Sequence, residues 1–314
     1  MVRRSRINRG KSIRKSIRKS IRKSSIRKSN RISNRKKNIS VFLQGGLGNQ
    51  LFQIFTTINY SLNNNIDFIF EYSDKLDIGE SRPTYWNNFL KSLKSYTTKS
   101  KLNYDIHEEK NFYYNKLPTF NDNIMLEGFF QSSKYFEDNY KNIIKLINIK
   151  QQKSLIKKKY KIYNKTNTIS IHFRLGDYVK LQDYHPVMNI DYYINSLKYI
   201  VNDTKKYNIL YFCQSKDNEV VLKNIEILKN IYNNCDFIKV SDKISDWEQL
   251  LLMSNCKHNI IANSSFSWWG AYFNDNKNKI VCYPSIWFGK KLKNNTKDLL
   301  PKDWIKITNK KSRR

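Results

Sequence analysis

Residues 39–53 read ISVFLQGGLGNQLFQ, a short apolar run followed by a glycine-rich turn and the start of an amphipathic segment. Strand, glycine loop and helix together form the outline of a phosphate-binding α/β unit. The dinucleotide fingerprint G-x-G-x-x-G is incomplete, because Gly46 and Gly48 supply two glycines and Leu51 stands at the third position. With Gly45 beside them, these glycines indicate a tight turn or a close approach to the backbone. From this stretch alone, a ligand-binding loop and a purely structural strand-to-helix connection are equally supported.

Apolar strands alternate with longer amphipathic segments along the rest of the chain. Strands are predicted at 39–43, 66–70, 124–130, 168–173, 209–213, 236–240, 258–262 and 279–283, and helices at 49–64, 133–148, 191–206, 217–232, 246–256 and from about 266. This alternation is typical of parallel sheets that are covered by helices on both faces. Because ligands of such sheets bind beyond the carboxyl ends of the strands, we expect the site in the loops that follow them.

A polar, basic stretch with few apolar anchors, residues 151–167, divides this pattern into two series. We therefore predict a chain of two α/β domains. The first domain spans residues 39–160 and the second spans residues 161–314. A basic tail, residues 1–38, precedes them.

The tail contains 17 of the 58 Lys and Arg residues and no acidic residue, which leaves +15 of the formal charge of +32 on the rest of the chain. Within it, SIRKSIRKSIRKSSIRKSN (12–30) is a four-residue repeat. One isoleucine per turn is too narrow an apolar stripe to fold alone, so we expect disorder and no role in catalysis. Nonspecific attachment to nucleic acid or another anionic partner, such as a membrane surface, is the alternative.

Composition favours a soluble globular protein, since 39% of the residues are hydrophobic and 14% are aromatic. No apolar run approaches the roughly 20 residues of a membrane span, and no signal peptide is visible. We therefore expect a cytoplasmic protein. The four cysteines are widely spaced without a C-x-x-C pair, which favours buried, reduced thiols over a zinc site.

The loop HFRLGDYV (172–179), which follows a predicted buried strand, gives the strongest chemical signal. His172, Arg174 and Asp177 crowd the end of this strand. A guanidinium there binds phosphate through two parallel hydrogen bonds and stays charged at any working pH. Asp177 orients Arg174, accepts a proton or caps the next turn. A purely structural Arg–Asp pair is the alternative, and the adjacent Gly176 favours the functional interpretation.

The segment IIANSSFSWWGAYF (260–273) gives the second signal. A buried strand leads into Asn263, Ser264, Ser265 and Phe266, and a helix follows. The free amide groups and the positive dipole end of such a helix make a natural anion site. Ordinary capping by serine or asparagine is the alternative.

Other polar segments give weaker signals. QDYHPV contributes His185, and the first turn of the helix in SDWEQLLLMSNC carries Asp246 and Glu248, which complement the dipole or meet a ribose or base. Trp268 and Trp269 are expected in the core. The chain has no D-x-D pair and no histidines at ligand spacing, so we expect no metal.

Five motifs occur in the order GGLGNQLFQ (45–53), LEGFFQSSKYF (126–136), SIHFRLGDY (170–178), HPVMNIDYY (185–193) and NSSFSWWGAYF (263–273), and PSIWF (284–288) follows them. In this order they resemble the alpha-1,2-fucosyltransferases of glycosyltransferase family 11. The resemblance spans about residues 39–290 and leaves the tail outside.

This resemblance implies a GT-B-like fold, in which two Rossmann-like α/β domains face a cleft. It also implies the inverting transfer of L-fucose from GDP-fucose to a galactose hydroxyl, without a metal or other cofactor. It puts the glycan acceptor on the first domain and the GDP-sugar donor on the second. By position, Arg174 binds the β-phosphate with His172 beside it. The binding set is completed by the turn residues Asn263, Ser264, Ser265 and Phe266.

The resemblance also implies a role for the opening glycine loop, which would lie across the cleft from the donor. There Gly45, Gly46 and Gly48 let the backbone come close to the donor, while Asn49 and Gln50 offer hydrogen bonds or cap the helix.

The chemistry of such a transfer agrees with these residues. Departure of GDP builds negative charge on the β-phosphate, which fixed cations and helix N-termini stabilise when no metal does so. The acceptor hydroxyl also needs a base, and Asp177, His185 and Glu127 are the candidates.

One position departs from the family pattern, which usually has two arginines in H-x-R-R-G-D. Here the second position is Leu175. This difference motivates an alternative in which the same fold transfers another nucleotide-activated deoxysugar or forms another linkage. A protein that binds nucleic acid through its tail is the alternative from a different class.

Overall fold

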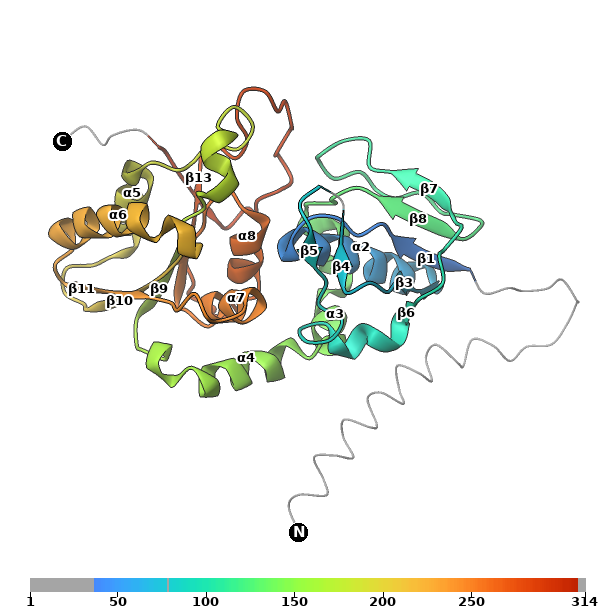
Figure 1. Cartoon of the computed structure of the whole chain (residues 1–314), viewed down its shortest axis with the longest axis horizontal. Coiled ribbons are helices and arrows are strands. Elements are labelled where there is room, and N and C mark those ends of the chain that lie inside the picture. Colours follow the sequence, from blue (N-terminus) through green and yellow to red (C-terminus); the bar gives the residue numbers. More distant parts are fainter. Residues whose placement is uncertain (1–36, 78, 310–314) are drawn as a thin grey trace, which may run out of the picture.

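The computed structural model describes residues 37–77 and 79–309. Within these residues two parallel β-sheets flanked by helices stand next to each other (Figure 1). The first unit carries the sheet strands between Asn38 and Glu127, and the second unit carries those between Thr168 and Ile307. The predicted α/β class is confirmed. The predicted tail, apart from its last two residues, lies outside the described residues. No helix in the described part is long and apolar enough to cross a membrane.

The sheet of the first unit has the strand order β2-β1-β8-β7, and each neighbouring pair is parallel. Its strands are β1 (Asn38–Val41), β2 (Asp67–Phe68), β7 (Asp105–Glu108) and β8 (Ile124–Glu127). Two small sheets accompany it, a parallel pair of β3 (Phe70–Glu71) with β6 (Thr97–Thr98) and an antiparallel hairpin of β4 (Lys75–Leu76) with β5 (Arg82–Pro83). Helix α2 (Leu47–Asn64) follows β1 and is buried along most of its length, because it is covered by both units.

The sheet of the second unit has the strand order β11-β10-β9-β12-β13-β14, again all parallel. Its strands are β9 (Thr168–His172), β10 (Tyr207–Phe212), β11 (Cys235–Lys239), β12 (His258–Ile260), β13 (Val281–Pro284) and β14 (Ile305–Ile307). Counted along the chain, this is the order 3-2-1-4-5-6 of nucleotide-binding folds. The order reverses between β9 and β12, and ligands of such sheets bind beyond the carboxyl ends of the strands at this point.

Four helices cover the two faces of the second sheet: α5 (Ile190–Ile200), α6 (Asn218–Ile231), α7 (Asp246–Ser254) and α8 (Ser265–Tyr272). The side chains of β10 show which helices share a face, because successive residues of a strand point to opposite sides. Ile209 and Tyr211 pack in one cluster with residues of α5 and α6. Leu210 and Phe212 pack in the other cluster, which contains residues of α7 and α8.

Helix α8 joins the two units, because it contacts β12 on one side and α2 on the other. Trp268 and Trp269 are fully buried, as predicted. The ring centroids of Phe52 and Trp268 lie 4.5 Å apart, and those of Phe55 and Trp269 lie 4.6 Å apart. One hydrophobic core therefore runs from the first sheet through α2 and α8 into the second unit.

Several predicted stretches differ from the structure. The strand predicted over 124–130 ends at Glu127, the helix predicted over 191–206 ends at Ile200, and two further stretches differ more. The helix predicted over 133–148 is divided into η2 (Ser133–Tyr135), η3 (Glu137–Asn139) and α3 (Tyr140–Leu146). Part of the stretch 151–167, predicted as a polar connection, belongs to helix α4 (Ile149–Lys159), whose buried residues recur every three or four positions. The domain boundary after residue 160 stays a prediction. The remaining short helices are η1 (Lys91–Tyr96), η4 (Lys161–Tyr163), η5 (Gly176–Lys180) and η6 (Ser215–Asp217).

The first turns of α2 and α8 touch at Gly48. A Cβ atom at Gly48 would lie 2.4 Å from the backbone carbon of Ser265 and 2.6 Å from its carbonyl oxygen. Any side chain at this position would therefore force the two helices apart. At Gly46, by contrast, a Cβ atom would meet nothing within 4 Å.

We expect Gly48→Ala to lower the free energy of unfolding by about 1–3 kcal/mol, because the added methyl group overpacks the contact between the helices. Gly46→Ala is the matched control, since its methyl group enters open space and its backbone is extended. Urea denaturation followed by tryptophan fluorescence measures both variants. Equal unfolding midpoints for the two variants would contradict a backbone contact at Gly48.

Candidate active site

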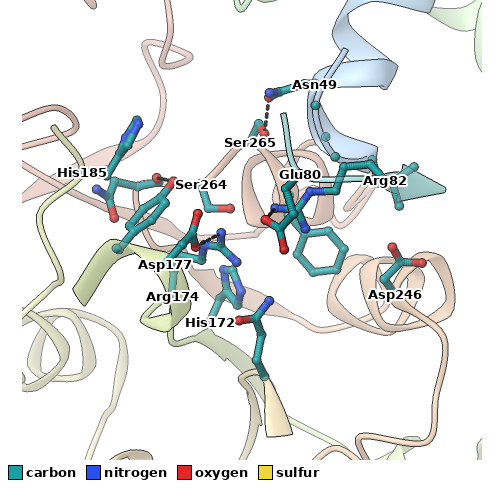
Figure 2. A pocket seen from close by; sticks show the side chains of 18 of the residues that line it. Asn49, Glu80, Arg82, His172, Arg174, Asp177, His185, Asp246, Ser264 and Ser265 are labelled. Atoms are coloured by element: carbon teal, nitrogen blue, oxygen red, sulfur yellow. Dashed lines mark hydrogen bonds and ion pairs between the residues drawn. The ribbon is translucent and has the colours of Figure 1, made fainter. Parts of the chain in front are cut away.

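A cavity of about 980 Å³ lies between the two units. The carboxyl ends of β9 and β12 and the N-termini of α2 and α8 border it, so the two units face a common cleft, as predicted (Figure 2). Most of the residues predicted for the site line this cavity: Gly45, Gly46, Gly48, Asn49, His172, Arg174, Asp177, His185, Asn263, Ser264, Ser265 and Phe266.

The glycine loop leads from β1 into the N-terminus of α2. Gly45 has a φ of +76°, in the left-handed region that favours glycine, and a Cβ atom there would lie 2.5 Å from Asn49 Nδ2. Gly46 is the N-cap of α2 and has no side chain to cap the helix, and the first turn contains no acidic residue. The positive end of the α2 dipole is therefore not neutralised by the helix itself.

Helix α8 begins in the same way from the second unit. Ser264 is its N-cap, yet the Ser264 side chain makes no capping hydrogen bond, and the first turn contains no acidic residue. The alternative of ordinary serine capping is therefore wrong for this helix. Both helices direct a positive dipole end and first-turn amides towards the cavity, which is the arrangement that binds anions.

A hydrogen bond across the cleft fixes the spacing of the two helix starts. Asn49 Oδ1 accepts a hydrogen bond from Ser265 Oγ at 2.6 Å (Figure 2). The same oxygen accepts a second hydrogen bond from Gln131 Nε2 at 2.9 Å. Asn49 thus links the glycine loop, the LEGFFQ segment and α8 in one network.

Arg174 lies in the wall of the cavity, and its side chain is 18% exposed. Its guanidinium forms an ion pair with Asp177, and its central carbon lies 4.7 Å from the centre of the Tyr178 ring. The Tyr178 hydroxyl in turn donates to the carbonyl oxygen of Asn263 at 3.3 Å. These contacts hold a permanent positive charge at the end of β9 with little freedom to move.

His172, the last residue of β9, is buried beside Arg174. Burial and the nearby Arg174 charge lower the pKa of His172 to about 3. Its Nδ1 atom has no hydrogen-bond partner among the described residues. His172 is therefore a neutral imidazole in the wall of the cavity.

Asn263 positions the loop that carries His185. Its Nδ2 atom donates to the carbonyl oxygens of Pro186 and Trp287, both at 3.0 Å. The loop is thereby tied to the PSIWF segment. The Asn263 Oδ1 atom is buried and has no partner among the described residues.

His185 lies in an aromatic part of the cavity. Its ring stacks on Tyr178 with 4.8 Å between centroids, and the Phe288 ring lies 5.8 Å away. Burial lowers the pKa of His185, while the Asp177 charge raises it and the Arg174 charge lowers it. The net direction is downward, so His185 is a neutral group that can accept a proton.

Two predicted site residues do not line the cavity. Gln50 is buried behind the glycine loop, where its Nε2 atom donates to the carbonyl oxygens of Gly45 and Pro83, both at 2.9 Å. Glu127 is the last residue of β8 and lies outside the cavity lining. Of the three candidate bases, only Asp177 and His185 are in the cavity.

Leu175 also points away from the cavity. It is buried in the core on the α5 and α6 side of the second sheet, together with Phe173. His172 and Arg174 face the cavity instead, as the alternation of side chains along an extended chain requires. The departure from the family pattern therefore lies in the core.

The sequence profile of glycosyl transferase family 11 matches residues 11–308. The chain belongs to this family. It is therefore a glycosyltransferase, of the hexosyltransferase class that was predicted.

Two relatives and one solved structure are similar to this chain. An alpha-1,2-colitosyltransferase of Escherichia coli is 28% identical over 291 residues, which cover 84% of this chain and 97% of the relative. The O-antigen biosynthesis glycosyltransferase WbnK of Escherichia coli is 30% identical over 193 residues, which cover 58% of this chain and 60% of WbnK. A variant of Arabidopsis thaliana FUT1 in complex with GDP is 12% identical, with a TM-score of 0.45 over 85% of this chain and 74% of that protein.

This family 11 enzyme has site residues that the sequence did not reveal. Arg82, Glu80 and Tyr85 line the cavity from the first unit, and no motif marks them. Asp246, one of two acidic residues predicted at the start of α7, also lines the cavity and accepts a hydrogen bond from the Tyr85 hydroxyl. The other, Glu248, instead pairs with a lysine of α4 at 2.7 Å.

Another unpredicted residue, Glu109, supports the cavity from behind. Its carboxylate accepts hydrogen bonds from the backbone amides of Phe129 and Phe130, at 2.8 and 2.9 Å. Burial raises the pKa of Glu109, and these two hydrogen bonds lower it. Glu109 thus shapes the LEGFFQ segment, from which Phe129 and Gln131 reach the cavity.

No group of three or more His, Cys, Asp or Glu side chains is arranged to hold a metal ion in residues 37–77 and 79–309. The expectation of a metal-independent reaction stays a prediction. All four cysteines are buried and free, as predicted.

We expect His172 to make the enzyme less stable as the pH falls from 6.5 to 5. The pKa of histidine drops from 6.5 in the unfolded chain to about 3 here, so the unfolded state binds more protons in this window. The expected loss at pH 5 is about 2 kcal/mol. Urea denaturation at each pH measures it, and His172→Asn should remove it while His258, buried with a pKa of about 4, still contributes. An unchanged pH dependence in His172→Asn would contradict a buried neutral His172.

Proposed function

We propose that this enzyme transfers L-fucose from GDP-fucose to a hydroxyl group of a galactose unit in a glycan, with inversion and without a metal ion. The proposed linkage is alpha-1,2. Family 11 membership supports the reaction class, and the relative named as an alpha-1,2-colitosyltransferase supports the linkage.

The observation that carries this proposal is the convergence of three sources of positive charge on one cavity. They are the uncapped N-termini of α2 and α8 and the guanidinium of Arg174. A sugar nucleotide has its negative charge concentrated in its diphosphate, which is the group that such a site recognises. The cavity volume of about 980 Å³ is at the upper end of small-molecule sites, as expected for a donor and an acceptor bound together.

In this arrangement the donor diphosphate lies in the cavity beside the two helix starts, and Arg174 contacts the β-phosphate. His172 contributes a neutral hydrogen bond beside it. The acceptor hydroxyl attacks the anomeric carbon from the face opposite the diphosphate. As the new bond between carbon and acceptor oxygen forms, the bond to the β-phosphate oxygen breaks, and its electron pair leaves with GDP. The added negative charge meets fixed dipoles and cations, so little reorganisation is needed in the transition state.

We place the acceptor at the aromatic part of the cavity. Phe112 from the first unit and Phe288 from the second lie edge to face there, with ring centroids 4.9 Å apart. Their apolar surface suits the C–H face of a sugar ring. His185 lies next to Phe288 and accepts the proton that the acceptor hydroxyl loses. Asp177 is a weaker candidate for this role, because its carboxylate is engaged by Arg174.

A second candidate function keeps the same site and replaces the fucosyl donor by a colitosyl donor. The observation that favours it is the colitosyltransferase relative, whose alignment covers 84% of this chain. The two sugars would occupy the same position next to the diphosphate. Product analysis after incubation with each GDP-sugar and a galactoside separates the two functions.

We expect Arg174→Ala to reduce GDP release from GDP-fucose by at least about 100-fold, because it removes a fixed positive charge from the leaving diphosphate. Circular dichroism and the thermal midpoint check that the variant is folded. Lys180→Ala, which removes an exposed positive charge after the same loop, is the control and should keep full activity. Absence of GDP release by the wild-type enzyme with any galactoside would refute the proposed donor.

We expect His185→Gln to lower kcat by about 100-fold or more, since general bases contribute 10²–10⁴ to such rates. In the wild-type enzyme, kcat/KM should fall towards acidic pH with an apparent pKa below 6.5, because burial lowers the pKa of His185. The variant should lose this acidic limb. If the limb persists in His185→Gln and disappears in Asp177→Asn, then Asp177 is the base.

A further inference from the structure

The first unit contributes a second arginine to the cavity. Arg82, at the start of β5, lines the same cavity as Arg174 and approaches it from the other side of the cleft (Figure 2). Its side chain is 30% exposed. No step of the proposed transfer reaction uses Arg82.

The neighbours of Arg82 are held in place by both units. The carbonyl oxygen of Pro83 accepts a hydrogen bond from Gln50 Nε2, which also binds the carbonyl oxygen of Gly45. The hydroxyl of Tyr85 donates to Asp246 of α7 across the cleft. Arg82 is therefore anchored to the glycine loop on one side and close to the second unit on the other.

The partner of Arg82 is easily exchanged. Its guanidinium forms an ion pair with Glu80, whose side chain is 68% exposed. Exposed ion pairs contribute little stability, about 0–1 kcal/mol. A phosphate group, which accepts two parallel hydrogen bonds from a guanidinium, is a stronger partner in a cavity where helix dipoles already favour anions.

Arg82 also lies near enough to the end of β9 for its charge to act on Tyr178 there. Leu175 is buried in the core, so Arg174 is the arginine that the H-x-R-L-G-D loop gives to the cavity. Burial raises the pKa of the Tyr178 hydroxyl, and the charges of Arg174 and Arg82 both lower it. Both guanidinium groups therefore act on the same small region at the end of β9.

We propose that Arg82 binds the donor diphosphate from the first unit and acts as a second cation opposite Arg174. This inference rests on the proposed use of a nucleoside diphosphate sugar. Glu80 holds the guanidinium until the diphosphate replaces it. Because the two arginines belong to different units, the donor is bound only where both walls of the cleft meet.

The affinities of GDP and GMP, measured by isothermal titration calorimetry, test this role, since the two differ by the β-phosphate. Arg82→Ala should weaken GDP binding about 10-fold to 100-fold and change GMP binding less than about twofold. Arg82→Lys keeps the charge but not the paired hydrogen bonds, so its GDP affinity should be intermediate. Lys75→Ala, an exposed lysine of the same hairpin that pairs with Asp77, is the matched control and should bind both nucleotides normally.

Glu80→Gln tests whether Glu80 and the diphosphate compete for Arg82. It should change the GDP affinity in the opposite direction to Arg82→Ala. Removing the competing carboxylate should strengthen GDP binding by about two- to fivefold, the range expected for an exposed ion pair. Weaker or unchanged GDP binding in this variant would show that Glu80 does not compete for Arg82.

The outcomes separate this inference from the proposed function. If the wild-type enzyme binds GDP and Arg82→Ala retains wild-type affinity for it, the role of Arg82 is wrong while the proposed donor stands. If the wild-type enzyme binds UDP, ADP or dTDP instead of GDP, the proposed donor is wrong, and the same comparison with the matching monophosphate tests Arg82. If it binds none of these diphosphates, both are wrong.

Discussion

The N-termini of α2 and α8 meet at one point, and the rest of the site depends on this contact. Two helix starts with like partial charges repel each other unless something negative lies between them. Here Gly48 lets the backbones touch, and the hydrogen bond from Ser265 to Asn49 holds them together. Neither helix brings an acidic residue or a side-chain cap of its own. The fold therefore keeps an anion site open.

The shared hydrophobic core explains how this unfavourable arrangement is maintained. The aromatic rings of α2 pack on Trp268 and Trp269, so the two units are joined by apolar contacts directly behind the cavity. Burial of large aromatic side chains is among the strongest stabilising contributions available to a protein. The core thus supplies the stability, and the polar network of Asn49 and Gln131 sets the geometry.

Much of this architecture can be predicted from the sequence, because apolar residues recur with a different period in strands and in amphipathic helices. The loops after β9 and β12 can be predicted for the same reason: polar residues such as Arg174 and Ser264 stand out after buried strands. Arg82 could not be found in this way, since it lies on a two-residue strand in a polar stretch, and only the tertiary fold brings it to Arg174. Glu127 shows the converse. Its motif suggested chemistry, yet the register of β8 places it outside the cavity.

Hydrogen exchange with and without GDP tests most directly whether both units hold the donor diphosphate. Most amides of the first turn of a helix lack a partner within the helix, and they gain protection when an anion binds to them. Mass spectrometry of peptides over residues 44–50 and 262–268 should show slower exchange in both segments with GDP. Protection confined to residues 262–268 would contradict binding by both units, because the second unit would then bind the diphosphate alone.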